Sequence, residues 1–226
     1  MKSISKYFFI LILSFSLSAR AQQGDTLVFR PSFSLGYDLA GLARNFLEPE
    51  VMMHQVTAAY EWQPNWFAAM EAGHMDVGVA RETHNYDARG LFFRAGVNYN
   101  LFQKNPAMKG DEIFLAFRYG FGWLDHEAPR IIITEPYWGS VEDVFEPAGY
   151  SAHWAEIGGG LKTKLFWNLY LGWDLRIRLM LARNAGSEME PYYISGFGKN
   201  EGNTSVMLHY SLYYKFSAGK NRIHIR

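Results

Sequence analysis

The stretch 112-EIFLAFRYGFGW-123 decides the fold of this chain. Large apolar side chains occupy every second position from Ile113 to Trp123, and between them stand Phe114, three small residues and Arg118. A period of two is that of a β-strand, whose successive side chains point to opposite faces. The stretch therefore predicts a long strand with one apolar face and one face of small and charged residues.

The same alternation recurs along most of the chain. It covers the segments 33–40, 52–62, 66–73, 90–100, 155–165, 169–181 and 205–216. The apolar faces carry no Lys, Arg, Asp or Glu. Most segments exceed the roughly 5–6 residues usual in a globular sheet and reach the ~9–11 of a tilted strand that crosses a bilayer. We expect an all-β fold, an eight-stranded antiparallel up-and-down transmembrane β-barrel within residues 22–216.

The connections alternate in length. Turns at 63–65 and 166–168 are short, whereas 124–150 is the longest link and 184–203 the next. Outer-membrane barrels place short turns in the periplasm and long loops outside, and here only the link 101–111 is long for a periplasmic turn. The order predicts that 124–150 is an extracellular loop.

Aromatic residues gather near the ends of the predicted strands, where a membrane barrel carries its two interfacial belts. At the periplasmic end these are Trp62, Trp66, Trp167 and Phe216, and at the outer end Trp123. These aromatic residues predict that outer-membrane lipid surrounds the barrel. The alternative is a soluble, lipocalin-like periplasmic binding protein, which also alternates but turns its apolar face inward.

The N-terminal residues have the features of an export signal. Lys2 and Lys6 precede the apolar run 7–17, and Ala19-Arg20-Ala21 is a small-residue cleavage site. We interpret 1–21 as a cleaved signal peptide, too short in its apolar part to span a bilayer. Residues 217–226 are expected to form a short basic periplasmic tail.

Composition excludes several classes of protein. The chain has 226 residues, no cysteine, and 22 basic against 22 acidic side chains. The missing cysteines exclude a disulfide framework and a thiolate zinc site. A neutral chain lacks the basic excess of a nucleic-acid binder, and no cofactor is expected.

Charged side chains recur on the predicted inner face. The expected lumen network comprises Arg94, Arg118, Glu156, Asp174, Arg176 and Arg178. Eight strands leave an interior that side chains can fill, and mixed signs can pair there. The network predicts a rigid, filled barrel, with a small solute pore as the alternative.

Two short patterns are candidates for chemistry. His209-x-Ser211 and Ser151-x-His153 each place a base and a hydroxyl on one face of a strand. A lipid A-modifying hydrolase or acyltransferase would need a carboxylate to orient the histidine, and Glu156 or Asp174 is the guess. No metal site is expected, because the histidines and acids at 74–84 and 125–127 show no repeated ligand spacing.

Three stretches together resemble a known family. EIFLAFRYGFG (112–122), GYSAHWAEIGGGLKTKLFWNLYLGWDLRIRLM (149–180) and YYISGFG (192–198) are similar to uncharacterised Gram-negative outer-membrane proteins that carry a domain-of-unknown-function label. The resemblance implies a small outer-membrane β-barrel and brings no catalytic residues with it.

The predicted loop 124–150 suggests a role. It contains the apolar run 131–134 and Tyr137-Trp138, which are unusual in a free loop and indicate a cap or a partner surface. The leading hypothesis is a non-enzymatic structural or partner-binding component of the outer membrane that binds a protein partner through this segment.

Overall fold

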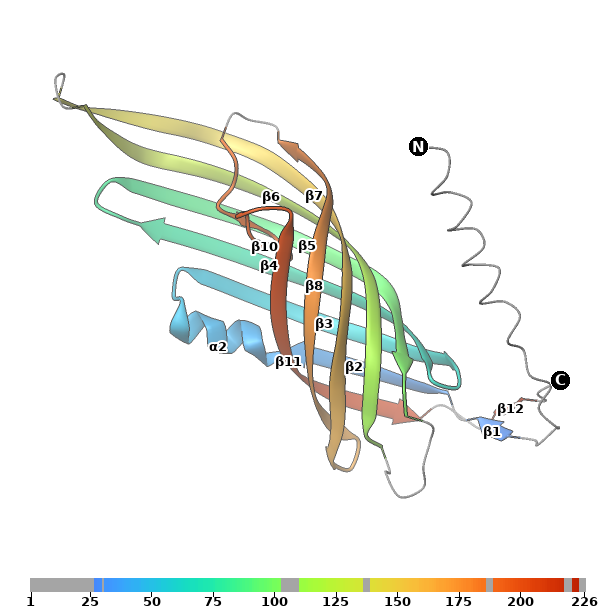
Figure 1. The fold of residues 1–226 in the computed structure, drawn as a ribbon. Coiled ribbons are helices and arrows are strands. Elements are labelled where there is room, and N and C mark those ends of the chain that lie inside the picture. Colours follow the sequence, from blue (N-terminus) through green and yellow to red (C-terminus); the bar gives the residue numbers. More distant parts are fainter. Residues whose placement is uncertain are drawn as a thin grey trace, which may run out of the picture. The chain divides into compact units, whose positions relative to one another are not determined.

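Eight antiparallel strands close into a barrel in the computed structural model, which describes residues 27–29, 31–102, 110–135, 139–185, 189–217 and 221–223 (Figure 1). The strands are β2 (Ser32–Asp38), β3 (Val51–Gln63), β4 (Trp66–Ala80), β5 (His84–Asn100), β6 (Glu112–Glu135), β7 (Gly139–Phe166), β8 (Leu169–Ala185) and β11 (Thr204–Ser217). Each pairs with its neighbour in the chain, and β11 closes the barrel against β2. The prediction of an eight-stranded up-and-down barrel is confirmed.

The apolar faces point outward, as the alternation predicted. Exposed side chains on the outer wall include Leu35, Val56, Met70, Leu91, Phe117, Leu175 and Leu208, whereas the side chains of Arg94 and Arg178 inside are 0% exposed. A soluble protein hides apolar groups and rarely leaves such a continuous apolar surface. This distribution contradicts the soluble, lipocalin-like alternative.

One end of the barrel is closed by tight turns, and we call it the turn end. Pro64-Asn65 joins β3 to β4 and Trp167-Asn168 joins β7 to β8. Asn65 and Trp167 have positive φ, 68° and 48°. Two-residue hairpins need left-handed residues, which asparagine tolerates and tryptophan adopts at a cost.

At the opposite end, the mouth, the expected long loops are mostly strand. β6 has 24 residues and β7 has 28, so 124–135 and 139–150, the described parts of the predicted loop, continue both strands as a hairpin. We call it the outer hairpin; Figure 1 shows it reaching beyond the other strands. β4 and β5 are likewise joined by only 81–83. Continued pairing satisfies the main-chain hydrogen bonds beyond the barrel wall.

The first connection contains a helix, α2 (Leu39–Leu47). The predicted strand 33–40 therefore ends early, at Asp38. The side chain of Asp38 accepts a hydrogen bond from Ala40 N at 3.1 Å and caps the helix. Of the helices formed by the described residues, none has the length and apolar character needed to cross a bilayer.

Two short pairs of strands complete the structure. β9 (Tyr193–Ile194) and β10 (Gly198–Lys199) form a small hairpin in the connection between β8 and β11. β1 (Leu27–Phe29) pairs with β12 (Asn221–Ile223) in a separate unit, so part of the expected basic tail forms a strand. The predicted signal peptide lies outside the described residues.

Candidate functional site

The middle of the lumen is filled by what we call the charged layer, namely Glu71, Arg94, Arg118, Glu156, Asp174, Arg176 and Arg178. All seven side chains are buried. Glu71 is the hub: its Oε2 lies 2.8 Å from Arg94 Nη1 and 2.8 Å from Arg176 Nη1. Arg176 also contacts Asp174 at 2.5 Å and Glu156 at 3.3 Å. The structure thus brings the six predicted network residues together around a seventh, Glu71.

The charges in this layer balance when Asp38, which lies beside it, is included. Arg118 Nε lies 3.5 Å from Glu71, and Arg178 Nε lies 3.0 Å from Glu156. Four arginines face three carboxylates, and Asp38, linked to Arg178 through His209, supplies a fourth. Buried ions of both signs can pair where ions of one sign would be untenable. These side chains occupy the cross-section of the barrel, which argues against the solute pore.

Above the charged layer, toward the mouth, the interior is apolar. Its core is formed by Val51, Met53, Met75, Val77, Phe92, Leu124, Tyr150, Trp154, Ile194 and Phe197. Two of these come from residues 193–199, the hairpin of β9 and β10, which we call the plug. Phe197 is fully buried, and its ring meets that of Trp154 edge-on, with centroids 5.9 Å apart. The connection before β11 therefore folds back into the barrel.

The plug is tied to the charged layer by its main chain. Arg94 Nη2 donates to the carbonyl oxygen of Gly196 at 3.0 Å, and Arg178 Nη1 donates to that of Phe197 at 2.9 Å. Gly196 has a φ of +77°, a conformation that favours glycine. Of the two expectations for 124–150, a cap or a partner surface, the cap is wrong, because the described residues of that segment extend as a hairpin and 193–199 fills the mouth.

Helix α2 clamps the plug from the side. Arg44 Nη2 lies 2.7 Å from Glu48 Oε2 and donates to the hydroxyl of Tyr193 at 3.0 Å. The Tyr193 hydroxyl also donates to Glu48 at 3.3 Å. The hydrogen bond from Arg44 lowers the pKa of Glu48. This contact joins two connections that sequence analysis did not associate.

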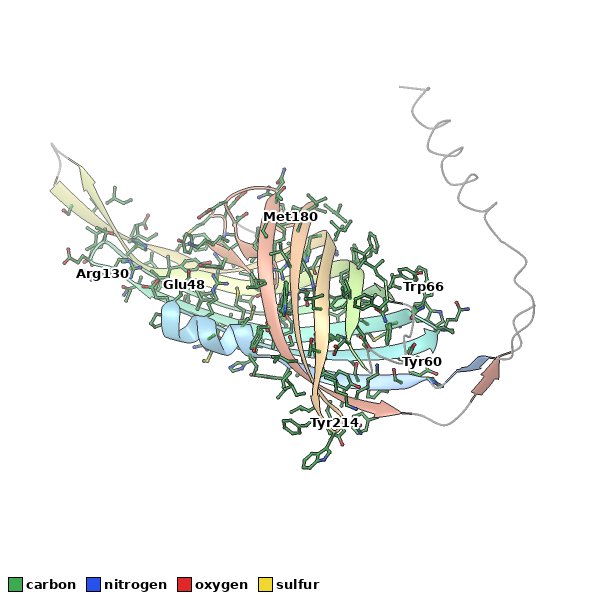
Figure 2. All side chains as sticks on the ribbon, turned by 60° about the horizontal axis from the view of Figure 1, so that its bottom comes forward. Glu48, Tyr60, Trp66, Arg130, Met180 and Tyr214 are labelled. Atoms are coloured by element: carbon green, nitrogen blue, oxygen red, sulfur yellow. The ribbon has the colours of Figure 1, made fainter. Side chains whose placement is uncertain are left out.

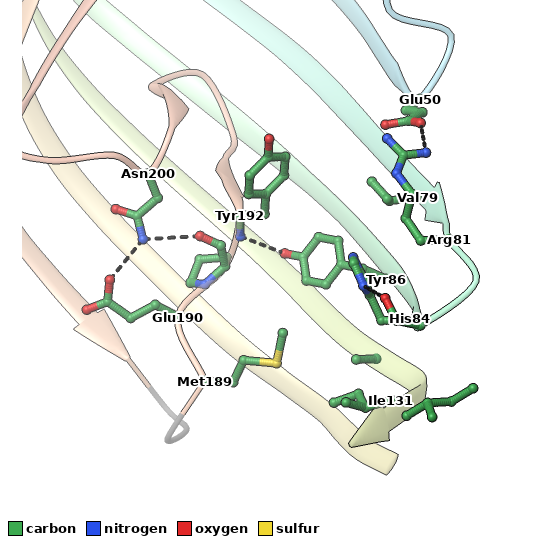
Figure 3. A pocket seen from close by; sticks show the side chains of 14 residues that line it. Glu50, Val79, Arg81, His84, Tyr86, Ile131, Met189, Glu190, Tyr192 and Asn200 are labelled. Atoms are coloured by element: carbon green, nitrogen blue, oxygen red, sulfur yellow. Dashed lines mark hydrogen bonds and ion pairs between the residues drawn. The ribbon is translucent and has the colours of Figure 1, made fainter. Parts of the chain in front are cut away.

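A pocket of about 680 Å³ opens at the mouth between the β4–β5 hairpin, the outer hairpin and the segment that precedes the plug. Figure 3 shows its lining, where Val79, Ile131 and Met189 are apolar and polar groups stand around them. Tyr192 N donates to the Tyr86 hydroxyl at 3.2 Å. Arg81 pairs with Glu50, and Asn200 donates to Glu190 at 3.1 Å. The polar groups of this pocket thus bond to one another.

His209 makes contacts that oppose the hydrolase hypothesis. Its Nδ1 lies 3.2 Å from Asp38 Oδ2, and its Nε2 accepts from Arg178 Nη2 at 2.9 Å. The orienting carboxylate is therefore Asp38, not Glu156 or Asp174. A general base for Ser211 needs a free ring nitrogen, and here the second nitrogen is engaged by a guanidinium. His209 works as a link between Asp38 and the charged layer.

The second pattern, Ser151-x-His153, does not support the hydrolase hypothesis either. His153 points to the outer wall, where its Nδ1 lies 2.6 Å from the Tyr119 hydroxyl. Among the residues that the structure describes, no group of three or more His, Asp and Glu side chains is arranged to hold a metal ion. His74 and Asp76 are 3.5 Å apart, and Asp76 also faces Arg89.

The predicted belt residues lie on the outer wall. Figure 2 shows Trp66 toward one end of the barrel. Trp62 and Trp66 contact each other there, with ring centroids 6.2 Å apart, and Phe216 meets Phe33 at 6.2 Å. Trp167, in the turn between β7 and β8, is 85% exposed. Trp123 faces outward where β6 leaves the barrel for the outer hairpin. The wall is thus bounded by aromatic residues toward both ends.

Solved structures of small barrels resemble this chain. Neisserial surface protein A is 10% identical over 86% of this chain and all of its own, with a TM-score of 0.43. A major outer membrane protein from Thermus thermophilus is 13% identical over 83% of this chain and 98% of its own, with a TM-score of 0.47. The attachment invasion locus protein Ail of Yersinia pestis is 11% identical over 84% of this chain and all of its own, with a TM-score of 0.41. The fold of this chain rests on its own strand pairing.

A family model matches nearly the whole sequence. Its match covers residues 1–219, so it includes every strand of the barrel. No curated protein matches the chain. By this match, the chain belongs to the family described as domain of unknown function DUF6048.

Proposed function

We propose that this chain is an outer-membrane barrel that binds a protein partner through its outer hairpin and catalyses no reaction. In this proposal residues 1–21 direct export and are removed, the turn end faces the periplasm, and the mouth faces outward. The apolar wall supports membrane insertion, and the filled lumen leaves display of the hairpin as the role that the geometry favours.

The observation that carries the proposal is the free edge of β7 from Val141 to Gly149. This stretch pairs with β6, whereas pairing with β8 begins only at Tyr150 opposite Ala185. Along this edge the described residues offer no second strand. Val141 and Val144 are each 56% exposed. An open edge is a template to which an extended segment of another protein adds a strand.

The charge of this edge selects the partner. Glu142, Asp143 and Glu146 lie within residues 139–149, a segment without lysine or arginine. On the neighbouring strand Arg130 faces Glu142 at 3.5 Å and offsets one of these charges. A basic extended segment matches the edge in hydrogen bonding and in charge.

Shortening the hairpin tests the proposal. Residues 129–144 are replaced by Asn-Gly, which keeps the pair Ala128–Phe145 and supplies the turn that a two-residue hairpin prefers. Partners cross-linked to the full chain in outer membranes are compared with those of the shortened chain. We expect a defined partner to be lost, while the gel mobility of unboiled samples shows that the barrel remains folded.

Two further variants separate shape from charge. Val141→Lys with Val144→Lys places charges on the edge and should abolish strand addition. Glu142→Gln with Glu146→Gln keeps the edge and should weaken capture more at low than at high ionic strength, because salt already screens these charges. Glu201→Gln, in the exposed segment before β11, is the matched control. If the shortened chain retains every partner of the full chain, the outer hairpin is not the binding surface.

A further inference from the structure

The barrel wall is incomplete beside β2. β2 pairs with β11 only from Ser32 to Asp38, and with β3 only from Phe33 to Tyr37. Beyond these pairs β3 continues toward the mouth along 51–55 and β11 along 204–210. On the sides that face each other, these two stretches have no strand partner among the described residues. The wall therefore has a gap toward the mouth.

Helix α2 stands beside this gap and leaves a groove. Gly41 packs against the Met53 carbonyl so closely that a Cβ at this position would clash with it. On the other side, between the helix and β11, lies a groove of about 640 Å³. Figure 1 shows α2 next to the ends of β3 and β11. A side chain at residue 41 would push the helix away from β3 and change the groove.

The groove is continuous with the lipid-facing wall. Val206 and Leu208 line it and are also exposed on the outside of β11, where Leu208 pairs with Leu175 of β8. Deeper in, Met53 and Met207 provide flexible apolar side chains. An acyl chain of the surrounding membrane can enter this groove sideways without crossing water.

The far end of the groove is cationic. Arg44 and Lys199 both line it, and both lie beside the ring of Tyr193, at 5.2 Å and 6.0 Å. Glu48 balances one of these charges through its ion pair with Arg44. Asp38, the other acid in the lining, is buried and bonded to His209. The end of the groove thus carries one positive charge in excess.

We propose that this groove is a binding site for a single membrane lipid with an anionic phosphate headgroup, whose acyl chain lies between α2 and β11 and whose phosphate contacts Arg44 and Lys199. The site is separate from the outer hairpin and does not depend on the protein partner proposed above. A zwitterionic lipid fits the apolar part and lacks the charge for the cationic end.

A single introduced cysteine provides the test, because the chain has none of its own. Ala43→Cys, in the groove lining, carries a bimane fluorophore in the full-length barrel in detergent micelles. Phosphatidylglycerol or phosphatidylcholine with a nitroxide on the acyl chain is then titrated in. Leu91→Cys, on the lipid-facing wall of β5 and away from the groove, is the matched control for contact with bulk lipid.

We expect saturable quenching at residue 43 with a several-fold preference for phosphatidylglycerol, and proportional quenching without preference at residue 91. Lys199→Gln and Arg44→Gln should each reduce the preference. Glu48→Gln breaks the same helix contact as Arg44→Gln but leaves both cations, so it should strengthen the preference. Equal quenching by the two lipids at residue 43 would overturn the proposal, as would a weakened preference in Glu48→Gln.

Discussion

Arg94 offers the sharpest test of what holds the barrel together. Its guanidinium lies 2.8 Å from Glu71 and 3.1 Å from Glu156, and it also bonds to the plug at Gly196 O. Arg94→Met keeps most of the side-chain volume and removes all three contacts. The layer together with Asp38 then holds one buried carboxylate more than it has arginines, a change that typically costs about 3–5 kcal/mol.

Urea unfolding in detergent micelles, followed by tryptophan fluorescence, measures this cost. With a denaturant dependence of roughly 2 kcal/mol per molar urea, a loss of ~4 kcal/mol lowers the midpoint by about 2 M. Arg89→Met is the matched control on the same strand. Arg89 is exposed to solvent, and its ion pair with Asp76, at 3.4 Å, is therefore weak. The loss of Arg89 should change the free energy of unfolding by less than ~0.5 kcal/mol.

A double variant decides whether the effect is electrostatic. Glu71→Gln alone leaves an excess of positive charge, and combined with Arg94→Met it restores the balance. We expect the combined loss to be smaller than the two single losses added, by about 1–3 kcal/mol. Strictly additive losses, or an Arg94→Met midpoint equal to that of Arg89→Met, would refute the view that paired charges stabilise the lumen.

Three further predictions concern the mouth and the wall. Burial lowers the pKa of His126 in the outer hairpin, so as the pH falls the unfolded hairpin binds a proton at a higher pH than the folded hairpin does. Hydrogen-exchange protection of 124–150 should therefore be full above about pH 6.5 and decrease below it. The decrease should be absent in His126→Leu and present in the control His84→Asn, which changes an exposed histidine. Phe197→Ala should cost the plug about 3–5 kcal/mol, seen as faster amide exchange in 193–199 with unchanged exchange in the barrel strands. Gly120→Ala forces a Cβ into the Trp154 indole and should cost ~1–3 kcal/mol in the same urea assay, while Gly149→Ala finds ordinary contacts and should cost little.

The sides of the strands were predictable from sequence, but their ends were not. Alternation alone assigned Arg118 to the lumen and Phe117 to the wall, since it needs only the period of the strand. The outer hairpin was not predicted from the sequence because its register shifts twice, between His126 and Ala128 and between Ala128 and Ile131. Each shift breaks the alternation that identifies a strand, so the segment resembled a loop.

The plug and helix α2 were not predicted from the sequence for a different reason. What holds Phe197 in the lumen is a pair of arginines on β5 and β8, and no local pattern around 193–199 reports on them. Asp38 followed by Leu39 could have signalled a helix cap, but the alternation continued through both residues and favoured a strand. The pairing of Glu71 with Arg176 likewise depends on how the barrel closes.

The charged layer and the plug together bear on the proposed role of the barrel in binding. In a lipid-facing barrel, burial of apolar side chains in the wall gives little preference for one arrangement, because lipid is as apolar as they are. Specificity must come from inside, where Glu71 and Glu156 are each surrounded by arginines and the plug fills the apolar mouth. Those contacts join β4, β5 and β8 to β6 and β7, the two strands from which the outer hairpin emerges. In the proposed function, a filled lumen is a rigid base that presents the free edge of β7 in one orientation, which would lower the entropy lost when a partner strand binds.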